Sequence, residues 1–265
     1  MKFIHTAPLH LLPIIDENKI QMVYANHLSN EKYLNYFIDK NNYEIILNSE
    51  GVDDFGNLIT LCNKLKANCI ILPNYPSYDT METIEASMKL GKVFKGMGFK
   101  IMYAPQCMVG DLDDLIYGFH HAISADWIDY VMISAQTAEL AYNINDNDKL
   151  KHNARIKLMY ELESKGILRK LIDRDKKIHL HGLNYGYNEI ISMKQFKKYI
   201  NSWDSSIAIQ LGIENKSINN EYINDKYDIN TSTENTESIA QASDNIEYID
   251  NLIEEYYIMK EGANI

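Results

Sequence analysis

The feature that most constrains the fold of this sequence is a regular alternation of short apolar runs with segments of helical pattern. Five runs are rich in β-branched and other apolar residues, as expected for strands buried on both faces. They cover residues 43–47, 68–72, 99–104, 130–133 and 177–180. Weaker strands are predicted at 19–25 and just before or at Trp203. A strand, a loop and a helix that repeat about every 30 residues are typical of βαβ units in a parallel sheet.

Amphipathic segments between these runs complete the pattern. Helices are predicted at residues 81–97, 111–124 and 149–173, the last interrupted near Gly166. The first of them should place a group of apolar side chains near one face: Met81, Ile84, Met88 and Val93. Seven or eight βα units close a barrel of about 250 residues, and the chain has 265. We therefore predict an α/β fold, a (β/α)8 TIM-type barrel with an extra C-terminal helix.

The C-terminal part differs in composition from the rest. Residues 213–244 are rich in Asn, Ser, Thr, Asp and Glu, as is typical of a polar surface excursion or a mobile loop. A helix is predicted at 245–260, where an apolar stripe should pack on the barrel: Ile249, Leu252, Ile253 and Tyr256. We divide the chain into a barrel domain at 1–212, a polar excursion at 213–244 and a C-terminal helix region at 245–265.

Composition argues against several classes of protein. The formal net charge is −11, which disfavours a broad nucleic-acid-coating surface because phosphates are neutralised by clustered Lys and Arg. The scattered Cys62, Cys69 and Cys107 fit neither a disulfide framework nor a structural zinc site. No run of 18 apolar residues occurs, and the first 15 residues lack the pattern of a signal peptide. These features predict a cytoplasmic protein with no membrane partner.

Polar side chains follow the ends of the predicted strands. In a parallel barrel the functional loops lie at the C-terminal ends of the strands, so these side chains should gather at one face. Amide, hydroxyl, imidazole and carboxylate groups suit a polar, planar ligand, and they stand at Asn48, Asn74, Gln106, Ser134, His181 and Asp204. Turns favour several of these residue types in any case, so their concurrence is more informative than any one of them.

The order of five motifs resembles that of a known family. The segments ILNSEG, ILPN with a later YDTMET, YAPQ, KIHLHG and SWDSSIAI follow one another within residues 20–212. In this order and spacing they resemble the tRNA-guanine transglycosylase superfamily. The resemblance is closest to its short phage-type branch, which includes enzymes that insert 7-deazaguanines into DNA. The resemblance itself implies a barrel fold and a phage or bacterial host cytoplasm.

The resemblance implies base exchange at the N-glycosidic bond of a purine or 7-deazaguanine nucleotide. A carboxylate attacks C1′ and displaces the base, and a second base then resolves the covalent intermediate. Asp204 stands at the position of the family nucleophile, and the target nucleotide must leave the base stack to reach it. Without the resemblance, Asp204 is equally an N-cap or Asx-turn residue.

Further residues are predicted to bind the substrate. They are Asn74, Asp79, Gln106, Ser134, His181, Gly182 and Ser205. Asp79 has an alternative role as the cap of the helix that begins near Met81. His181 departs from the leucine of the family, and its side chain is expected to point into the pocket.

Two departures from the family affect the chemistry. Asn48 stands in place of the second carboxylate, and an amide can position a ligand but accepts no proton near neutral pH. We still place Asn48 beside Asp204 in the catalytic centre. Asn74 replaces the aspartate that reads the guanine-like edge, and it offers one acceptor and one donor group. The two changes predict altered base specificity, altered chemistry or lost activity.

Three functions stay open on the sequence alone. The first is base exchange, or base release by a DNA glycosylase of the same fold. DNA is favoured over tRNA because no cysteine follows Cys107, whereas the large tRNA-acting members carry a C-terminal zinc site. The second is a non-catalytic nucleotide-binding or partner-binding subunit, as a homodimer or beside a heterologous subunit, which lost its general base at Asn48. The third is an enzyme of free nucleosides. No cofactor is expected.

Overall fold

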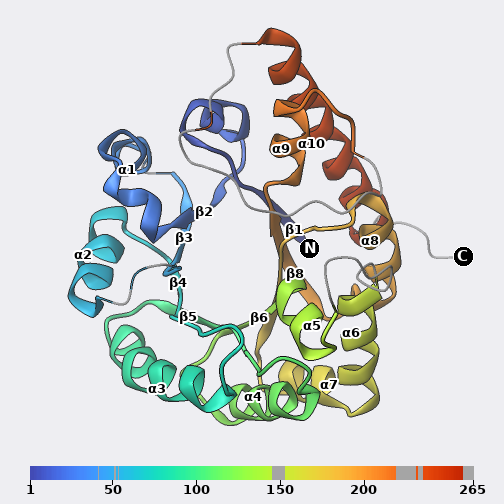
Figure 1. Ribbon diagram of the computed structural model, residues 1–265. Helices are drawn as coiled ribbons and strands as arrows, with labels where there is room; N and C mark the ends of the chain where they lie inside the picture. Colours follow the sequence, from blue (N-terminus) through green and yellow to red (C-terminus); the bar gives the residue numbers. More distant parts are fainter. Residues whose placement is uncertain are drawn as a thin grey trace, which may run out of the picture.

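Eight parallel strands form a nearly closed barrel with helices around the outside (Figure 1). The computed structural model describes residues 1–40, 42–50, 52, 54–144, 153–218, 231 and 235–258. Hydrogen bonds join the strands in the order β1-β8-β7-β6-β5-β4-β3-β2, and β1 and β2 are the two edges that meet. The predicted fold class is confirmed. The strands are β1 (Lys2–His5), β2 (Ile20–Tyr24), β3 (Glu44–Asn48), β4 (Cys69–Ile71), β5 (Lys100–Tyr103), β6 (Tyr130–Ser134), β7 (Lys177–His181) and β8 (Ile200–Ser205).

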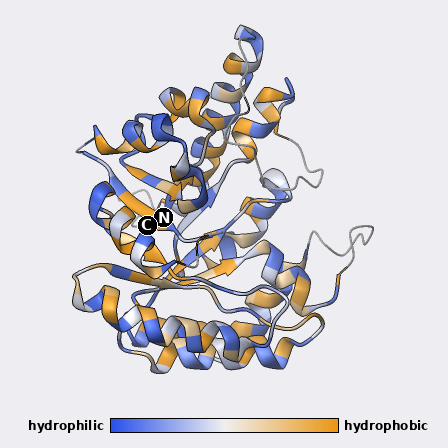
Figure 2. Ribbon diagram, turned by 60° about the vertical axis from the view of Figure 1, so that its left-hand side comes forward, coloured by the Kyte–Doolittle hydropathy of each residue, from blue (hydrophilic) through white to orange (hydrophobic). Residues whose placement is uncertain are grey.

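Helices cover the outer surface of the barrel. Figure 2 shows hydrophobic residues along the strands and a mixture of hydrophobic and hydrophilic residues along the helices. In the part of the chain that the structure describes, no helix is both long enough and apolar enough to cross a bilayer. The helices are η1 (Leu9–Ile15), η2 (Ala25–Ser29), α1 (Glu31–Ile38), α2 (Phe55–Leu65), α3 (Thr80–Gly96), α4 (Leu112–Ser124), α5 (Ala135–Ala141), α6 (Ala154–Ser164), α7 (Ile167–Asp173), α8 (Gly186–Met193), η4 (Lys194–Phe196), α9 (Ile207–Ile213) and α10 (Thr236–Tyr257).

The interior of the barrel is apolar on most of its circumference and polar on one wall. Alternate side chains of each strand point inward. On β1 to β6 these form one buried apolar cluster of Ile4, Met22, Ile46, Cys69, Ile71, Met102, Ala104 and Met132. On β7 and β8 the buried side chains include His179 and Asp204 instead. The polar wall therefore lies where these two strands pair.

Strand β1 is absent from the sequence-based prediction. It has four residues, Lys2–His5, and pairs in parallel with β8, so that Ile4 lies opposite Asp204. A run this short, with a lysine and a histidine in it, carries no clear periodicity. Its pairing with β8 places the first strand of the chain beside the last one.

Helix α3 buries a different face from the one predicted. Met81, Met88 and Val93 are exposed, and the buried residues are mostly small: Thr80, Thr83, Ile84, Ser87, Gly91 and Phe94. A Cβ atom on Gly91 would stand 2.2 Å from the Trp127 ring. The helix approaches its neighbours closely through small residues, so an apolar stripe in the sequence does not mark its inner face.

The C-terminal helix is longer than predicted. Helix α10 begins at Thr236, nine residues before the predicted start at 245, and Asn235 caps it by accepting a 3.0 Å hydrogen bond from the Glu237 N–H. This start lies inside the segment that was predicted to be a polar excursion. The first turns of α10 pack against α9 through small residues such as Ala242, so they show no apolar stripe in the sequence. Much of that excursion, 219–230 and 232–234, lies outside the described residues, as do 259–265.

Helices α9 and α10 lie side by side (Figure 1) and are in close contact at one glycine. A Cβ atom on Gly212 would stand 2.3 Å from the Ala242 backbone. The buried Asn245 side chain strengthens the contact, because its amide donates to the Ala208 carbonyl at 3.2 Å and to the Lys216 carbonyl at 2.9 Å. The extra helix is thereby fixed to the barrel.

We expect Gly212→Ala to lower the free energy of unfolding by about 1–3 kcal/mol, because the added methyl group forces α9 and α10 apart. Urea denaturation measures the change. Gly96→Ala is the matched control, since no atom lies within 4 Å of the added Cβ there. It should leave the stability unchanged or raise it by up to about 1 kcal/mol, because alanine favours a helix more than glycine does. Equal effects of the two changes would contradict the close contact.

Candidate active site

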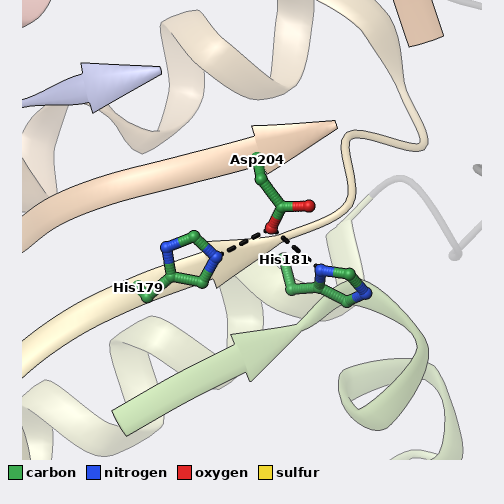
Figure 3. Close-up of side chains that lie close together, drawn as sticks. All are labelled: His179, His181 and Asp204. Carbon is green, nitrogen blue, oxygen red and sulfur yellow. Dashed lines mark hydrogen bonds and ion pairs between the residues drawn. The ribbon is translucent and has the colours of Figure 1, made fainter. Parts of the chain in front are cut away.

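Two histidines and one aspartate form a buried cluster at the C-terminal ends of β7 and β8 (Figure 3). His179 Nε2 lies 2.7 Å and His181 Nδ1 lies 2.8 Å from the same oxygen of Asp204, Oδ1. His179 and His181 are two residues apart on β7, so their side chains share one face of the strand. Asp204 lies opposite His181 in the register of β8. The alternation and pairing of two strands thus bring the three side chains together.

A shift in the strand register sets this arrangement. Ile178 pairs with Ile200 but His179 pairs with Ser202, so Asn201 is the extra residue of a bulge. The Asn201 side chain accepts the Ile178 N–H at 2.8 Å. The shift brings the Ser202 hydroxyl within 2.8 Å of His179 Nδ1. Without it, neither Ser202 nor Asp204 would stand beside the histidines.

Asp204 is held in its ionised form. Burial alone would raise its pKa, but the charge of His181 and the hydrogen bonds from His179 and His181 outweigh burial and hold the pKa below the ordinary value. An ionised carboxylate only accepts hydrogen bonds, so the protons lie on His179 Nε2 and on His181 Nδ1. The second oxygen, Oδ2, is buried and has no hydrogen-bond partner among the described residues.

The same three side chains are the candidate ligands for a cation in the described part of the chain, since their nitrogen and oxygen atoms lie within 4.8 Å of one another. Ligand atoms at about 2.1 Å from a tetrahedral ion stand about 3.4 Å apart. Both nitrogen–oxygen distances here are shorter, at 2.7 and 2.8 Å. We therefore interpret the cluster as a hydrogen-bonded acid–base group.

A pocket of about 170 Å³ adjoins the cluster. It extends across the C-terminal ends of β3 to β7, and most of the polar side chains in its wall are amides or hydroxyls. It contains five of the residues that the sequence predicted for the site, namely Asn48, Asn74, Gln106, Ser134 and His181. The other residues that line it are Ser49, Glu50, Pro73, Pro76, Met132, Gln136 and Thr137. His181 belongs both to the pocket and to the cluster.

Hydrogen bonds fix the orientation of the amides in the pocket wall. Gln106 Nε2 donates to Asn74 Oδ1 at 3.0 Å, and Thr137 Oγ1 donates to Gln106 Oε1 at 3.0 Å. Asn48 Oδ1 accepts the Glu50 N–H at 3.1 Å, and Ser134 Oγ accepts the Thr137 N–H at 3.4 Å as the cap of α5. Thr137 was not predicted as a site residue. The signal for it in the sequence is its place three residues after Ser134, which caps the helix that follows the strand.

Three other predicted residues have structural positions outside the pocket wall. Asp79 accepts the Met81 N–H at 2.8 Å, and therefore caps α3, as its alternative interpretation proposed. Ser205 Oγ accepts the Ile207 N–H at 3.1 Å at the start of α9. Gly182 has a positive φ of 75°, a conformation that favours glycine. It forms the turn directly after His181.

Arg155, which the sequence did not single out, fixes the end of β7 from behind. This buried residue of α6 donates to the His181 carbonyl at 2.7 Å and to the Gly182 carbonyl at 2.6 Å. Its Nε donates to Glu189 at 2.8 Å, and its guanidinium lies 4.9 Å from the Trp203 ring centre. Burial raises the pKa of Glu189, and Arg155 opposes this rise. The backbone of His181 therefore depends on a buried ion pair.

Comparisons with known proteins identify the fold and no family. No family model and no curated protein matches the chain. A protein from Coccidioides immitis with a provisional assignment as a fructose-1,6-biphosphate aldolase has a TM-score of 0.50 and 8% identity, over 97% of this chain and 91% of that one. A D-tagatose 3-epimerase-like protein has a TM-score of 0.48 and 12% identity, over 96% and 99%. Likeness at this level of identity concerns the barrel fold alone.

We expect Arg155→Met to lower the free energy of unfolding by about 3–5 kcal/mol near neutral pH, because it leaves Glu189 buried without its partner. Joining it with Glu189→Met should recover much of the loss. Arg169→Met is the control, since Arg169 is exposed and its ion pair is with Asp173 on the same helix. There the change in stability should be below about 1 kcal/mol. Chemical denaturation of the wild type and the three variants tests this, and equal stability of the Arg155 single and double variants would contradict it.

Proposed function

We propose that this chain exchanges the base of a purine-like or 7-deazaguanine nucleotide at the N-glycosidic bond, with Asp204 as the nucleophile. The state of the Asp204 carboxylate carries the proposal. Its Oδ1 is fixed by two imidazoles, and in Figure 3 its other oxygen points the same way as the arrowheads of the surrounding strands, toward the mouth of the barrel. A carboxylate held through one oxygen can attack through the other.

The reaction has two displacements at C1′. In the first, Asp204 Oδ2 bonds to C1′ while the C1′–N bond breaks and its electron pair leaves with the base. In the second, a nitrogen of the incoming base bonds to C1′ and Asp204 is released as a carboxylate. Positive charge develops at C1′ in both steps, and an ionised carboxylate stabilises it. The net configuration is retained.

The pocket suits a planar base. Its volume is about 170 Å³. Common sites for drug-sized ligands begin at about 300 Å³, so this pocket is smaller than they are. A single base is of the right scale, whereas a whole nucleotide would leave its sugar and phosphate outside. The Asn74 and Gln106 amides offer both donors and acceptors, which suits a base edge of mixed character. The resemblance to the transglycosylase motifs supports the same chemistry and favours DNA over tRNA as the carrier of the base.

Base release to water is the second candidate, and the burial of Asp204 favours it. The side chain of Asp204 is 1% exposed, while that of His181 is 22% exposed and lines the pocket. A histidine oriented by a buried carboxylate activates a hydroxyl or a water. In that case the chain is a glycosylase, and Asp204 orients His181. The non-catalytic alternative has its support in Asn48, whose amide oxygen is bonded to the Glu50 N–H.

We expect a covalent nucleotide adduct on Asp204 when the protein is incubated with [14C]guanine and duplex DNA, tRNA or deoxyguanosine. Intact-mass and peptide spectra locate the adduct, and label transferred to the polymer or nucleoside measures exchange. Asp204→Asn should reduce exchange by at least about 1,000-fold, because an amide is no nucleophile. EDTA in the buffer should leave the rate unchanged, because neither of the proposed displacements uses a cation.

The exposed Asp39→Asn is the matched control, and it should keep the wild-type rate. Full activity in Asp204→Asn would eliminate the nucleophilic role. Release of unlabelled base from the substrate in stoichiometric excess over the protein, without any incorporation of [14C]guanine, would identify a glycosylase. A base or nucleotide that binds without any turnover would identify a binding subunit.

A further inference from the structure

We propose that His181 is the proton-transfer residue of this site, serving the leaving and the incoming base in place of the carboxylate that is missing at Asn48. This inference rests on the proposed function and names a second catalytic residue for it. Its starting point is the pocket wall, in which two of the described side chains that line the cavity can ionise, Glu50 and His181. The remaining lining groups are amides, hydroxyls and apolar side chains.

Histidine is the better suited of the two. Glu50 is exposed and stands on the loop after β3, where its backbone N–H is bonded to the Asn48 side chain. His181 is partly buried at the end of β7 and belongs to both the pocket and the cluster. Histidine is also the residue type whose ordinary pKa lies nearest to neutral pH, so an imidazole both gives and takes a proton there.

The position of His181 is fixed on two sides. Its Nδ1 donates to Asp204 Oδ1 at 2.8 Å, and its carbonyl accepts from Arg155 at 2.7 Å. Figure 3 shows its second ring nitrogen on the side away from Asp204. With the proton of Nδ1 directed to the carboxylate, Nε2 is the nitrogen that exchanges a proton with a base. The adjacent carboxylate stabilises the imidazolium, as in other aspartate–histidine pairs.

In this scheme His181 gives one proton to the leaving base and takes one proton back from the incoming base. The imidazolium gives its Nε2 proton to the ring nitrogen of the leaving base as the C1′–N bond breaks, and becomes neutral. The incoming base then gives its N–H proton to Nε2 as its nitrogen bonds to C1′ and Asp204 leaves. The imidazolium is regenerated, so one turnover neither takes up nor releases a proton. A neutral amide at Asn48 could perform neither transfer.

The surroundings of His181 determine its behaviour with pH. On the neighbouring strand Asp204 bears a negative charge, and on its own strand His179 donates to the same oxygen. Arg155 lies behind the backbone, and Glu50 lines the same pocket. Of these groups, Asp204 is in direct contact with the ring, and it favours the imidazolium. The contact with Asp204 therefore supports the imidazolium that is needed before the base departs.

The test measures [14C]guanine exchange into duplex DNA, tRNA and deoxyguanosine by the wild type and by His181 variants. His181→Gln should lower kcat by about 100-fold or more while the circular dichroism spectrum stays unchanged. Imidazole added to His181→Ala should restore at least about tenfold of the lost rate, since it supplies the proton carrier. Asn48→Asp on the His181→Gln background should also regain activity, with the pH profile displaced toward that of a carboxylate.

His120→Gln is the matched control, because His120 is an exposed histidine on α4, and it should keep the wild-type rate within about twofold. A merely structural role for His181 would give a slow His181→Ala that neither imidazole nor Asn48→Asp restores, and this outcome overturns the inference. So does a His181→Gln variant as fast as the wild type. Absence of exchange in the wild type overturns the proposed function instead, and the inference falls with it.

Discussion

A carboxylate kept ionised inside a barrel is the constraint on which the rest of this site depends. A buried charge is tolerated when it is paired and hydrogen-bonded, and Asp204 meets that condition through His179 and His181. Those two side chains must share one face of β7, and β8 must stand in the register that places Asp204 beside them. The bulge at Asn201 provides that register. The other six strands, β1 to β6, fill the rest of the interior with apolar side chains.

A second buried ion pair, between Arg155 and Glu189, lies outside the barrel behind the end of β7. Arg155 binds the carbonyls of His181 and Gly182, and its partner Glu189 comes from α8. The pair therefore joins α6, α8 and the end of β7. Since one partner alone would be a buried unpaired charge, the two residues must be kept or lost together. The position of the His181 imidazole thus depends on two residues that do not line the pocket.

Much of the barrel could be predicted from the sequence because buried parallel strands and amphipathic helices leave strong periodic patterns. The strand-end rule also brought Asn48, Asn74, Gln106, Ser134 and His181 to one pocket. The prediction failed where pairing or close approach decides the outcome. Strand β1 is too short to have a period, and α3 buries small residues because Trp127 packs on Gly91.

Long-range partners were equally hidden from the sequence. Arg155 and Glu189 are 34 residues apart, and no local pattern connects an arginine on one helix with a glutamate on another. The bulge at Asn201 is hidden too, because one extra residue changes the register without changing composition. Asp79 shows the opposite case, in which a local rule was sufficient: an aspartate one position before a helix caps that helix.

The amides at Asn48 and Asn74 acquire a physical meaning beside this cluster. A carboxylate at position 48 or 74 would bring a further negative charge toward Asp204, and each carboxylate would raise the pKa of the other. With amides there, neither position adds a negative charge, and the two histidines hold the pKa of Asp204 low. The carboxylate then stays ionised, as the proposed nucleophilic role requires, over the pH range in which an imidazole exchanges protons. Amides on one side of the pocket thus agree with a proton carrier on the other side, as proposed for His181.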